Sequence, residues 1–368
     1  ILYIVVMRMI FIYISFLFFI NCNSTKKIKV DLDSEIIIPK SYSVNKTTEK
    51  IEIDGKDDEL IWKKANYSDD FIDIEGIKTP SQKTNVKMLW DEDNLYVFAK
   101  IFENHIWGDI TERDQVIYYN NDFEVFINPN KHVFSYGEIE INALGTEWDL
   151  YLNKPYRLKG KEDSSWNING LKSAVHINGS LNDPRDIDNY WTVEMAIPLR
   201  EISKLKDPFD YSQPKVKDVW RVNFSRVNWD HDLINGKYSR KKINGKYLPE
   251  YNWVWSSQGV INMHVPENWG FLTFSNSNSQ VKENYETSNE INTEQVLYAF
   301  FRKITFKELK YLKELKENEE IEFETVMINN QEISCNFLKT ESGYIISAID
   351  KKNNIKLSIS QDGLIKKY

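Results

Sequence analysis

Residues 121–142 read NDFEVFINPNKHVFSYGEIEIN and contain two segments in which polar and apolar side chains alternate. In both segments the acids Glu124, Glu138 and Glu140 occupy every second position, between Phe, Val and Ile. An alternation with period two is typical of a strand that buries one face and turns the other away from the core. We therefore expect two neighbouring strands, separated by the turn at Asn128-Pro129, whose carboxylates share one face.

The same pattern extends on both sides of this stretch. Residues 84–90 and 95–101 form a predicted hairpin around the turn formers 91–94, and further strands are expected at 148–153, 172–178, 190–197, 219–227 and 269–275. Many short strands without an intervening helical rhythm indicate an antiparallel architecture. We predict a mainly β fold, a jelly-roll-like or immunoglobulin-like antiparallel β-sandwich over residues 49–275.

The remaining chain divides by composition. Residues 23–48 are polar without sustained periodicity and are predicted to be a tether, and residues 276–293 are rich in Asn, Ser and Glu and are predicted to be a linker. Thr293 is a predicted cap for a helix over 294–317, followed by strands at 321–328, 332–339, 343–349 and 355–360. We therefore expect residues 294–368 to form a small α+β unit.

The N-terminal segment 1–22 is interpreted as an export signal. From Met7 it has one basic residue, Arg8, before an apolar stretch that ends at Asn21-Cys22 and turns polar. This ending resembles a bacterial lipoprotein box, which implies lipidation of Cys22 and a location in the periplasm or at the outer membrane. A plain signal peptide with secretion, or an uncleaved anchor, is the alternative.

Composition excludes several classes of function. The 368 residues carry 47 Lys and Arg against 55 Asp and Glu, a net charge of −8, without the basic stripe of a nucleic-acid-binding protein. Two cysteines cannot make a disulfide framework or a four-thiolate zinc site, and five scattered histidines show no metal-ligand spacing. Phosphate-binding loops and the motifs of serine hydrolases and zinc proteases are missing from the sequence.

Aromatic and planar polar side chains cluster around the alternating strands. The chain has 11 Trp and 20 Tyr, residues that combine a flat apolar face with a polar group. Sugars are recognised by such faces together with Asn, Glu and Arg side chains that meet hydroxyl pairs. The predicted carbohydrate contacts from this pattern are Trp107, Tyr118, Tyr119, Glu124, Glu140, Asn142, Trp148, Arg221, Asn223, Arg226 and Trp255, whereas Trp62, Trp90, Trp191 and Trp269 are predicted to lie in the core.

A set of motifs, taken in order, resembles one known family. The motifs are IEIDGKDDELIWKKA (51–65), WDEDNLYV (90–97), NDFEVFINP (121–129), EIEINALGTEWDL (138–150), KPYR (154–157), WRVNFSRV (220–227) and NWVWSSQG (252–259) with MHVPENWG (263–270). Together they resemble the family 9 carbohydrate-binding domain and its relatives in Bacteroidetes lipoproteins.

This resemblance implies a β-sandwich over 49–275 that binds saccharides, partners glycoside hydrolases, and in some members carries structural calcium. In characterised members two tryptophans enclose the sugar end. Here the corresponding positions fall near Tyr118 and Met263, so Met263 joins the predicted contacts while the tryptophan pair itself is missing.

The preferred hypothesis is a non-catalytic saccharide-binding lipoprotein that supports carbohydrate catabolism. A structural or assembly lipoprotein that binds a protein partner is the main alternative. A hydrolase acting on O-glycosyl bonds would have to use carboxylates within the sandwich, such as Glu124, Glu138 or Glu140. Electron transfer through haem would need ligands such as Met263 and His264, and the sequence has no C-x-x-C-H attachment motif.

Overall fold

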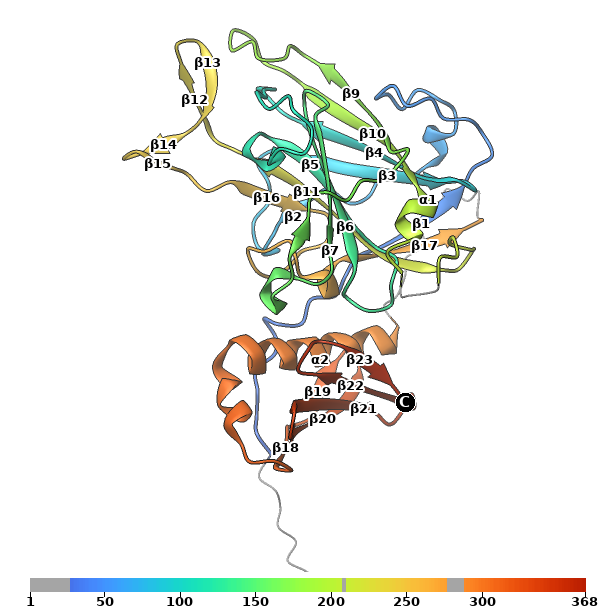
Figure 1. Ribbon diagram of the computed structural model, residues 1–368, viewed down its shortest axis with the longest axis vertical. Coiled ribbons are helices and arrows are strands. Elements are labelled where there is room, and N and C mark those ends of the chain that lie inside the picture. Colours follow the sequence, from blue (N-terminus) through green and yellow to red (C-terminus); the bar gives the residue numbers. More distant parts are fainter. Residues whose placement is uncertain (1–26, 207–209, 277–287) are drawn as a thin grey trace, which may run out of the picture.

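The structure, a computed structural model, describes residues 27–206, 210–276 and 288–368 (Figure 1). The first unit contains strands β1 (Ser41–Lys46), β2 (Ile72–Asp73), β3 (Thr84–Trp90), β4 (Asn94–Phe102), β5 (Asp122–Asn128), β6 (Tyr136–Asn142), β7 (Glu147–Leu152), β8 (Glu162–Asp163), β9 (Lys172–Asn178), β10 (Tyr190–Pro198), β11 (Val219–Asn228), β12 (His231–Ile234), β13 (Lys237–Arg240), β14 (Lys242–Ile243), β15 (Lys246–Tyr247), β16 (Tyr251–Val254) and β17 (Gly270–Ser275). Its helices are α1 (Leu199–Ser203) and the 3₁₀ helices η1 (Trp62–Lys64), η2 (Ile117–Tyr119), η3 (Tyr156–Leu158) and η4 (Pro266–Asn268).

One long sheet in the order β8-β7-β6-β5-β11-β17-β1-β3-β4-β10-β9 forms the body of this unit. The predicted hairpin appears as β3 and β4, which pair in antiparallel register from Thr84 with Ile101 to Trp90 with Leu95. Neighbours are antiparallel except at β1, which runs parallel to both β17 and β3. The mainly β fold expected from the alternating sequence is confirmed.

The sheet curls so that its two halves face each other across one core. Val86, Val97 and Val193 from β3, β4 and β10 belong to the same buried cluster as Val125 and Phe224 from β5 and β11. Packing apolar faces from both halves into one interior is the arrangement of a sandwich. The polar positions of β5 and β6 therefore lie on the outer face of one layer, as the alternation predicts.

The predicted tether over 23–48 is in part wrong. Of its residues, 27–48 are described, and β1 lies among them as a strand inside the main sheet. Leu32 is buried against the C-terminal unit, and Ile28 forms a parallel bridge with Phe323 of that unit. The few apolar residues in this polar stretch contact segments that are distant in sequence. Local periodicity therefore did not reveal that this stretch is structured.

The second unit packs one helix on a six-stranded sheet, as expected in outline. It contains α2 (Asn289–Phe306), the 3₁₀ helix η5 (Glu308–Glu314), and strands β18 (Glu320–Glu322), β19 (Val326–Ile328), β20 (Gln331–Thr340), β21 (Gly343–Asp350), β22 (Ile355–Ser360) and β23 (Ile365–Lys367). The helix begins earlier than predicted because the Ser288 hydroxyl, not Thr293, accepts a hydrogen bond from Ile291 N at 3.2 Å. The hairpin turn at Asn329-Asn330 has positive φ at both residues, which the tightest two-residue turns require.

Helix α2 lies between the C-terminal sheet and the first unit in Figure 1. Buried ion pairs join the two units: Arg302 of α2 contacts Glu267 of η4, and Arg221 of β11 contacts Glu294 of α2. None of the helices in the described part of the chain combines the length and apolar character needed to cross a membrane.

Candidate functional site

A row of side chains crosses five strands on the outer face of one layer. The strand registers pair Trp148 with Glu140, Glu140 with Glu124, and Glu124 with Ser225. Ser225 in turn lies opposite Val254 of β16. Directly opposed residues on adjacent strands lie side by side on one face, so an aromatic ring, two carboxyl groups and a hydroxyl form a continuous line.

Trp148, Glu140 and Glu124 of this row line the floor of a pocket of about 430 Å³, a size typical of small-molecule sites. Its acidic lining is Glu124, Glu138, Glu140 and Glu250, its rings are Tyr118, Phe126, Trp148, Tyr156 and His264, its amides are Asn252 and Asn262, and its apolar wall is Ile74, Leu150, Ile261 and Met263. The pocket therefore offers flat apolar faces beside hydrogen-bonding groups.

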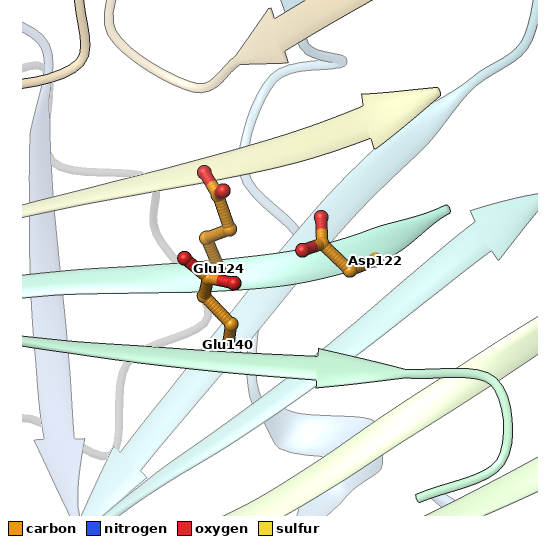
Figure 2. A group of neighbouring side chains, drawn as sticks. All are labelled: Asp122, Glu124 and Glu140. Atoms are coloured by element: carbon orange, nitrogen blue, oxygen red, sulfur yellow. The ribbon is translucent and has the colours of Figure 1, made fainter. Parts of the chain in front are cut away.

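Three carboxyl groups lie close together on β5 and β6 (Figure 2), and two of them, Glu124 and Glu140, line the pocket. One oxygen from each of Asp122, Glu124 and Glu140 lies within 4.8 Å of the other two, and all three residues are buried. Asp122 and Glu124 lie two residues apart on β5, so their side chains share one face of the sheet. Glu140 lies directly opposite Glu124 on the neighbouring strand β6. Glu140 Oε2 accepts a hydrogen bond from Tyr118 N at 3.0 Å, and Asp122 Oδ1 accepts one from Val227 N at 3.3 Å.

Burial and mutual repulsion make these acids hard to ionise. Burial, reinforced by neighbouring carboxylates, raises the pKa of Asp122, Glu138 and Glu140 well above the ordinary values of such groups. Burial raises the pKa of Glu124 to about 7. At neutral pH the pocket therefore contains carboxyl groups that hold protons or require a cation.

We expect the stability of the chelator-treated protein to fall as the pH rises from about 4.5 to about 7. The pKa of Glu124 in the folded chain lies above the ordinary value of 4.5, so the folded state holds a proton that the unfolded state releases. Raising the pH across this window therefore favours unfolding. Urea unfolding at pH 5 and pH 8 measures the change. The Glu124→Gln variant, which cannot titrate at this position, should show a smaller fall; an equal fall in both proteins would contradict the assignment.

Five of the predicted contact residues line the pocket. Tyr118, Glu124, Glu140, Trp148 and Met263 come together there. Tyr119 is 44% exposed but points elsewhere, with the Arg240 guanidinium 4.4 Å from its ring centre. The carboxylates and Trp148 were found by strand alternation, whereas Met263 was found through the family resemblance.

Two predicted aromatic contacts are core residues instead. Trp255 is 1% exposed, and its ring packs near Phe224 and directly over Gly270, where an added Cβ would lie 2.2 Å from the indole. Trp107 is 3% exposed and stacks on Tyr238 with ring centres 6.2 Å apart. Neither indole has a face free for a sugar. The predictions that Trp107 and Trp255 are carbohydrate contacts are therefore wrong.

The predicted amides serve the backbone. Asn142 accepts hydrogen bonds from Leu144 N and Thr146 N and donates one to Ile110 O. Asn223 pairs with both backbone groups of Ser256, at 2.9 and 3.0 Å. The hydrogen bonds of Asn142 hold a turn in place and those of Asn223 hold a neighbouring segment. Neither side chain lines the pocket.

The predicted arginines form internal ion pairs. Arg226 is fully buried on the opposite face of β11, where it meets Glu103 at 3.3 Å and donates to Phe102 O at 2.7 Å. Arg221 lies 2.9 Å from Glu294 in the contact with α2. The pattern WRVNFSRV predicted two arginines on one strand. It did not show that Arg226 faces the interior of the first unit and that Arg221 faces the second unit.

Sequence reasoning left several lining residues out of the predicted contacts. Tyr156 and His264 lie within quoted motifs, KPYR and MHVPENWG, and those motifs were the available signal. Glu138 lies two residues before Glu140 in the same alternating pattern, which was the signal for placing it at the pocket. Asn252 opens the motif NWVWSSQG, whereas Glu250 and Asn262 lie outside the motifs and reach the pocket only in the folded chain.

Residues 53–212 match the family described as carbohydrate family 9 binding domain-like. The match includes the row formed by Glu124, Glu140 and Trp148, whereas the wall from Glu250 to His264 lies beyond it. This match confirms the resemblance inferred from the motifs. No curated protein matches the chain.

Three solved structures are among those similar to this chain. A family 9 carbohydrate-binding module from Caldicellulosiruptor kristjanssonii in complex with cellotriose is 13% identical, with a TM-score of 0.42 over 67% of this chain and 98% of that chain. A family 9 module from the same organism in complex with glucose is 15% identical, with a TM-score of 0.42 over 65% and 97%. A candidate carbohydrate-binding protein from Bacteroides uniformis is 14% identical, with a TM-score of 0.46 over 64% and 99%. Since these TM-scores lie below 0.5, the family assignment rests on the sequence match alone: residues 53–212 match the carbohydrate family 9 binding domain-like family.

Proposed function

We propose that this chain binds a saccharide in the pocket over β5, β6 and β7, without chemical turnover. The observation that carries the proposal is the composition of the pocket: rings and paired polar groups line one cavity on a domain of a carbohydrate-binding family. Pockets of this kind bind by apolar contact and are oriented by a few polar groups.

Aromatic and polar side chains would contact different parts of the sugar. The rings of Trp148, Tyr156 and Tyr118 offer faces for the C–H surface of a sugar, and the carboxyl and amide groups of the floor and rim meet its hydroxyls. Trp148 Nε1 is buried without a hydrogen-bond partner among the described residues, so it remains available as a donor to a ligand. Glu124 and Glu140 are neighbours on one floor, a position suited to accepting or donating hydrogen bonds to adjacent hydroxyls.

A glycan array on the full chain, followed by calorimetry on each saccharide that binds, tests the proposal. We expect saturable binding that weakens by at least about fivefold in Trp148→Ala and in Tyr156→Ala, because each change removes an aromatic face worth about 1 kcal/mol or more. Tyr311→Ala is the matched control, since Tyr311 is an exposed tyrosine of the C-terminal unit.

Two results would refute the proposal. One is a folded chain that binds no glycan, which would favour the protein-assembly alternative. The other is binding that neither pocket variant weakens. A turnover assay with the same saccharides separates binding from hydrolysis: product release that disappears in Glu124→Gln would show an enzyme.

We also propose that the chain is exported and anchored by a lipid on Cys22, in the periplasm or at the outer membrane, and supports carbohydrate catabolism beside glycoside hydrolases. The support is the sequence pattern of residues 1–22, which lie outside the described residues. Labelling with a fatty acid in a bacterial host should mark the intact chain and not Cys22→Ser; equal labelling of both would exclude this anchor.

A further inference from the structure

We propose that the saccharide bound in the pocket is part of an acidic polysaccharide, whose negative groups lie on a basic arm formed by residues 233–248. This inference rests on the proposed function and names the chemical class of its ligand. The basic arm reads LINGKYSRKKINGKYL and contains INGKY twice, at 234–238 and 243–247. It has five Lys and Arg and no Asp or Glu, a local concentration of positive charge that the net charge of −8 conceals.

Each copy of the repeat forms the turn of a short hairpin. Asn235-Gly236 and Asn244-Gly245 have positive φ at both residues, as the tightest two-residue hairpin turns require. These turns close the hairpins β12–β13 and β14–β15, which stand out from the body of the first unit in Figure 1. The basic arm therefore carries its charges on two projecting hairpins, where a long ligand can reach them.

The charges of the basic arm are not neutralised within the described chain. Lys237, Lys242 and Lys246 are exposed, and Arg240 and Lys241 are half-buried. None of the five forms an ion pair with a carboxylate of the described residues. Clustered cations without internal partners attract a polymer of negative charge, and the arm has no acid of its own to repel it.

Aromatic rings connect the basic arm to the pocket. Tyr118 lines the pocket, and its ring centre lies 4.8 Å from that of Tyr119. The Arg240 guanidinium lies 4.4 Å from the centre of the Tyr119 ring and 4.2 Å from that of Tyr247. Lys242 lies opposite Tyr247 in the hairpin register, 4.3 Å from its ring centre. Since Tyr119 is 44% exposed and Tyr247 is 47% exposed, these rings and cations form an accessible track that starts at the pocket.

The pocket itself suits a sugar unit without charge. Its described lining contains four Glu and no Lys or Arg, and burial lowers the pKa of His264 to about 3, so that this ring is neutral at physiological pH. A carboxylate or sulfate group of the bound chain would find no cation there. The basic arm supplies both kinds of contact that such a chain needs next to the pocket, because rings pack against sugar faces and Lys and Arg bind anionic substituents.

Calorimetric titration of the full chain with polygalacturonate, dextran sulfate and neutral dextran tests the inference. Polygalacturonate carries carboxylates and dextran sulfate carries sulfates, so the two polymers distinguish the two sources of negative charge. We expect at least one of them to bind at least about tenfold more tightly than dextran. Raising the NaCl concentration from about 0.05 M to about 0.5 M should remove most of this difference, because salt screens exposed charges.

Exposed side chains of the basic arm provide the variants. Lys242→Gln/Lys246→Gln should weaken binding of the acidic polymer by at least about fivefold, because two charge contacts are lost. Lys351→Gln/Lys352→Gln is the matched control: it changes the net charge equally at exposed lysines of the C-terminal unit, and the affinity should change by less than about twofold. Tyr247→Ala should also weaken the binding, by at least about threefold, a loss that attraction by charge alone would not produce. Since all these side chains are exposed, the variants should remain folded.

The outcomes separate this inference from the proposed function. The inference is overturned if neither acidic polymer binds more tightly than dextran, if both double variants weaken the binding equally, or if a DNA duplex competes as well as the acidic polymer. It is also overturned if Trp148→Ala leaves the binding of the acidic polymer unchanged, because the same chain must occupy the pocket and the arm. Binding of neutral saccharides that depends on Trp148, without any effect of the arm variants, would leave the proposed function standing while this inference fails. If no saccharide responds to Trp148→Ala, the proposed function fails first.

Discussion

Glu267→Gln is expected to lower the free energy of unfolding by about 3–5 kcal/mol, because it removes the buried carboxylate that pairs with two guanidinium groups, one buried and one half-buried. Glu267 is 0% exposed, and its two carboxylate oxygens meet Arg302 Nη1 at 2.9 Å and Arg157 Nη2 at 2.5 Å. Although burial opposes ionisation, Arg157 and Arg302 hold the pKa of Glu267 below its usual range.

The effect should extend across both units. Arg302 lies on α2 and also contacts Glu35 in the N-terminal segment, so Glu267 joins three parts of the chain. Because the pKa of Glu267 is lowered, its contribution is present above the ordinary carboxyl pKa and is lost as the pH falls through the folded value. A single cooperative urea transition, shifted to lower urea in the variant, is the expected observation.

Glu92→Gln is the matched control for this measurement. Glu92 is an 81% exposed side chain paired with Lys46, and such surface pairs contribute about 0–1 kcal/mol. If Glu267→Gln cost no more than Glu92→Gln, the buried network would not hold the two units together.

Trp255→Ala is expected to lower the free energy of unfolding by about 3–5 kcal/mol, the usual cost of emptying a buried aromatic site. Its indole fills the space between Phe224 and the backbone at Gly270 and belongs to the main core cluster. Thermal and urea unfolding measure the loss.

Tyr311→Ala provides the comparison, because an exposed ring should change stability by no more than about 0.5 kcal/mol. Trp148→Ala, at the pocket, should affect saccharide binding more than stability. Loss of saccharide binding in a Trp255→Ala protein of unchanged stability would instead restore the sequence-based interpretation of Trp255 as a contact residue.

Much of the layer that carries the pocket could be predicted from the sequence. Alternation in residues 121–142 identified β5 and β6, and it placed Glu124, Glu138 and Glu140 on a common face, because period two is a local property of the extended chain. The same rule correctly put Arg221 and Ser225 of β11 on one side. It should have separated Arg226 from them, since that residue occupies the opposite phase of the strand.

The C-terminal unit shows a similar limit. Its turns, such as Asn329-Asn330, follow from residues that tolerate positive φ. The start of α2 at Asn289 was missed because the predicted linker, which is polar throughout, contains both the true cap and the first helical turn.

The sequence by itself therefore determined the β class of the fold, the family of residues 53–212 and the line of acids along β5 and β6. Only the tertiary structure decided which tryptophans have an open face, how closely the carboxyl groups of Asp122, Glu124 and Glu140 approach one another, and that residues 250–264 close the pocket. The physical reason is range: backbone pleating and turn preferences act between near neighbours, whereas exposure and the approach of like charges depend on strand register and on segments far apart in the chain.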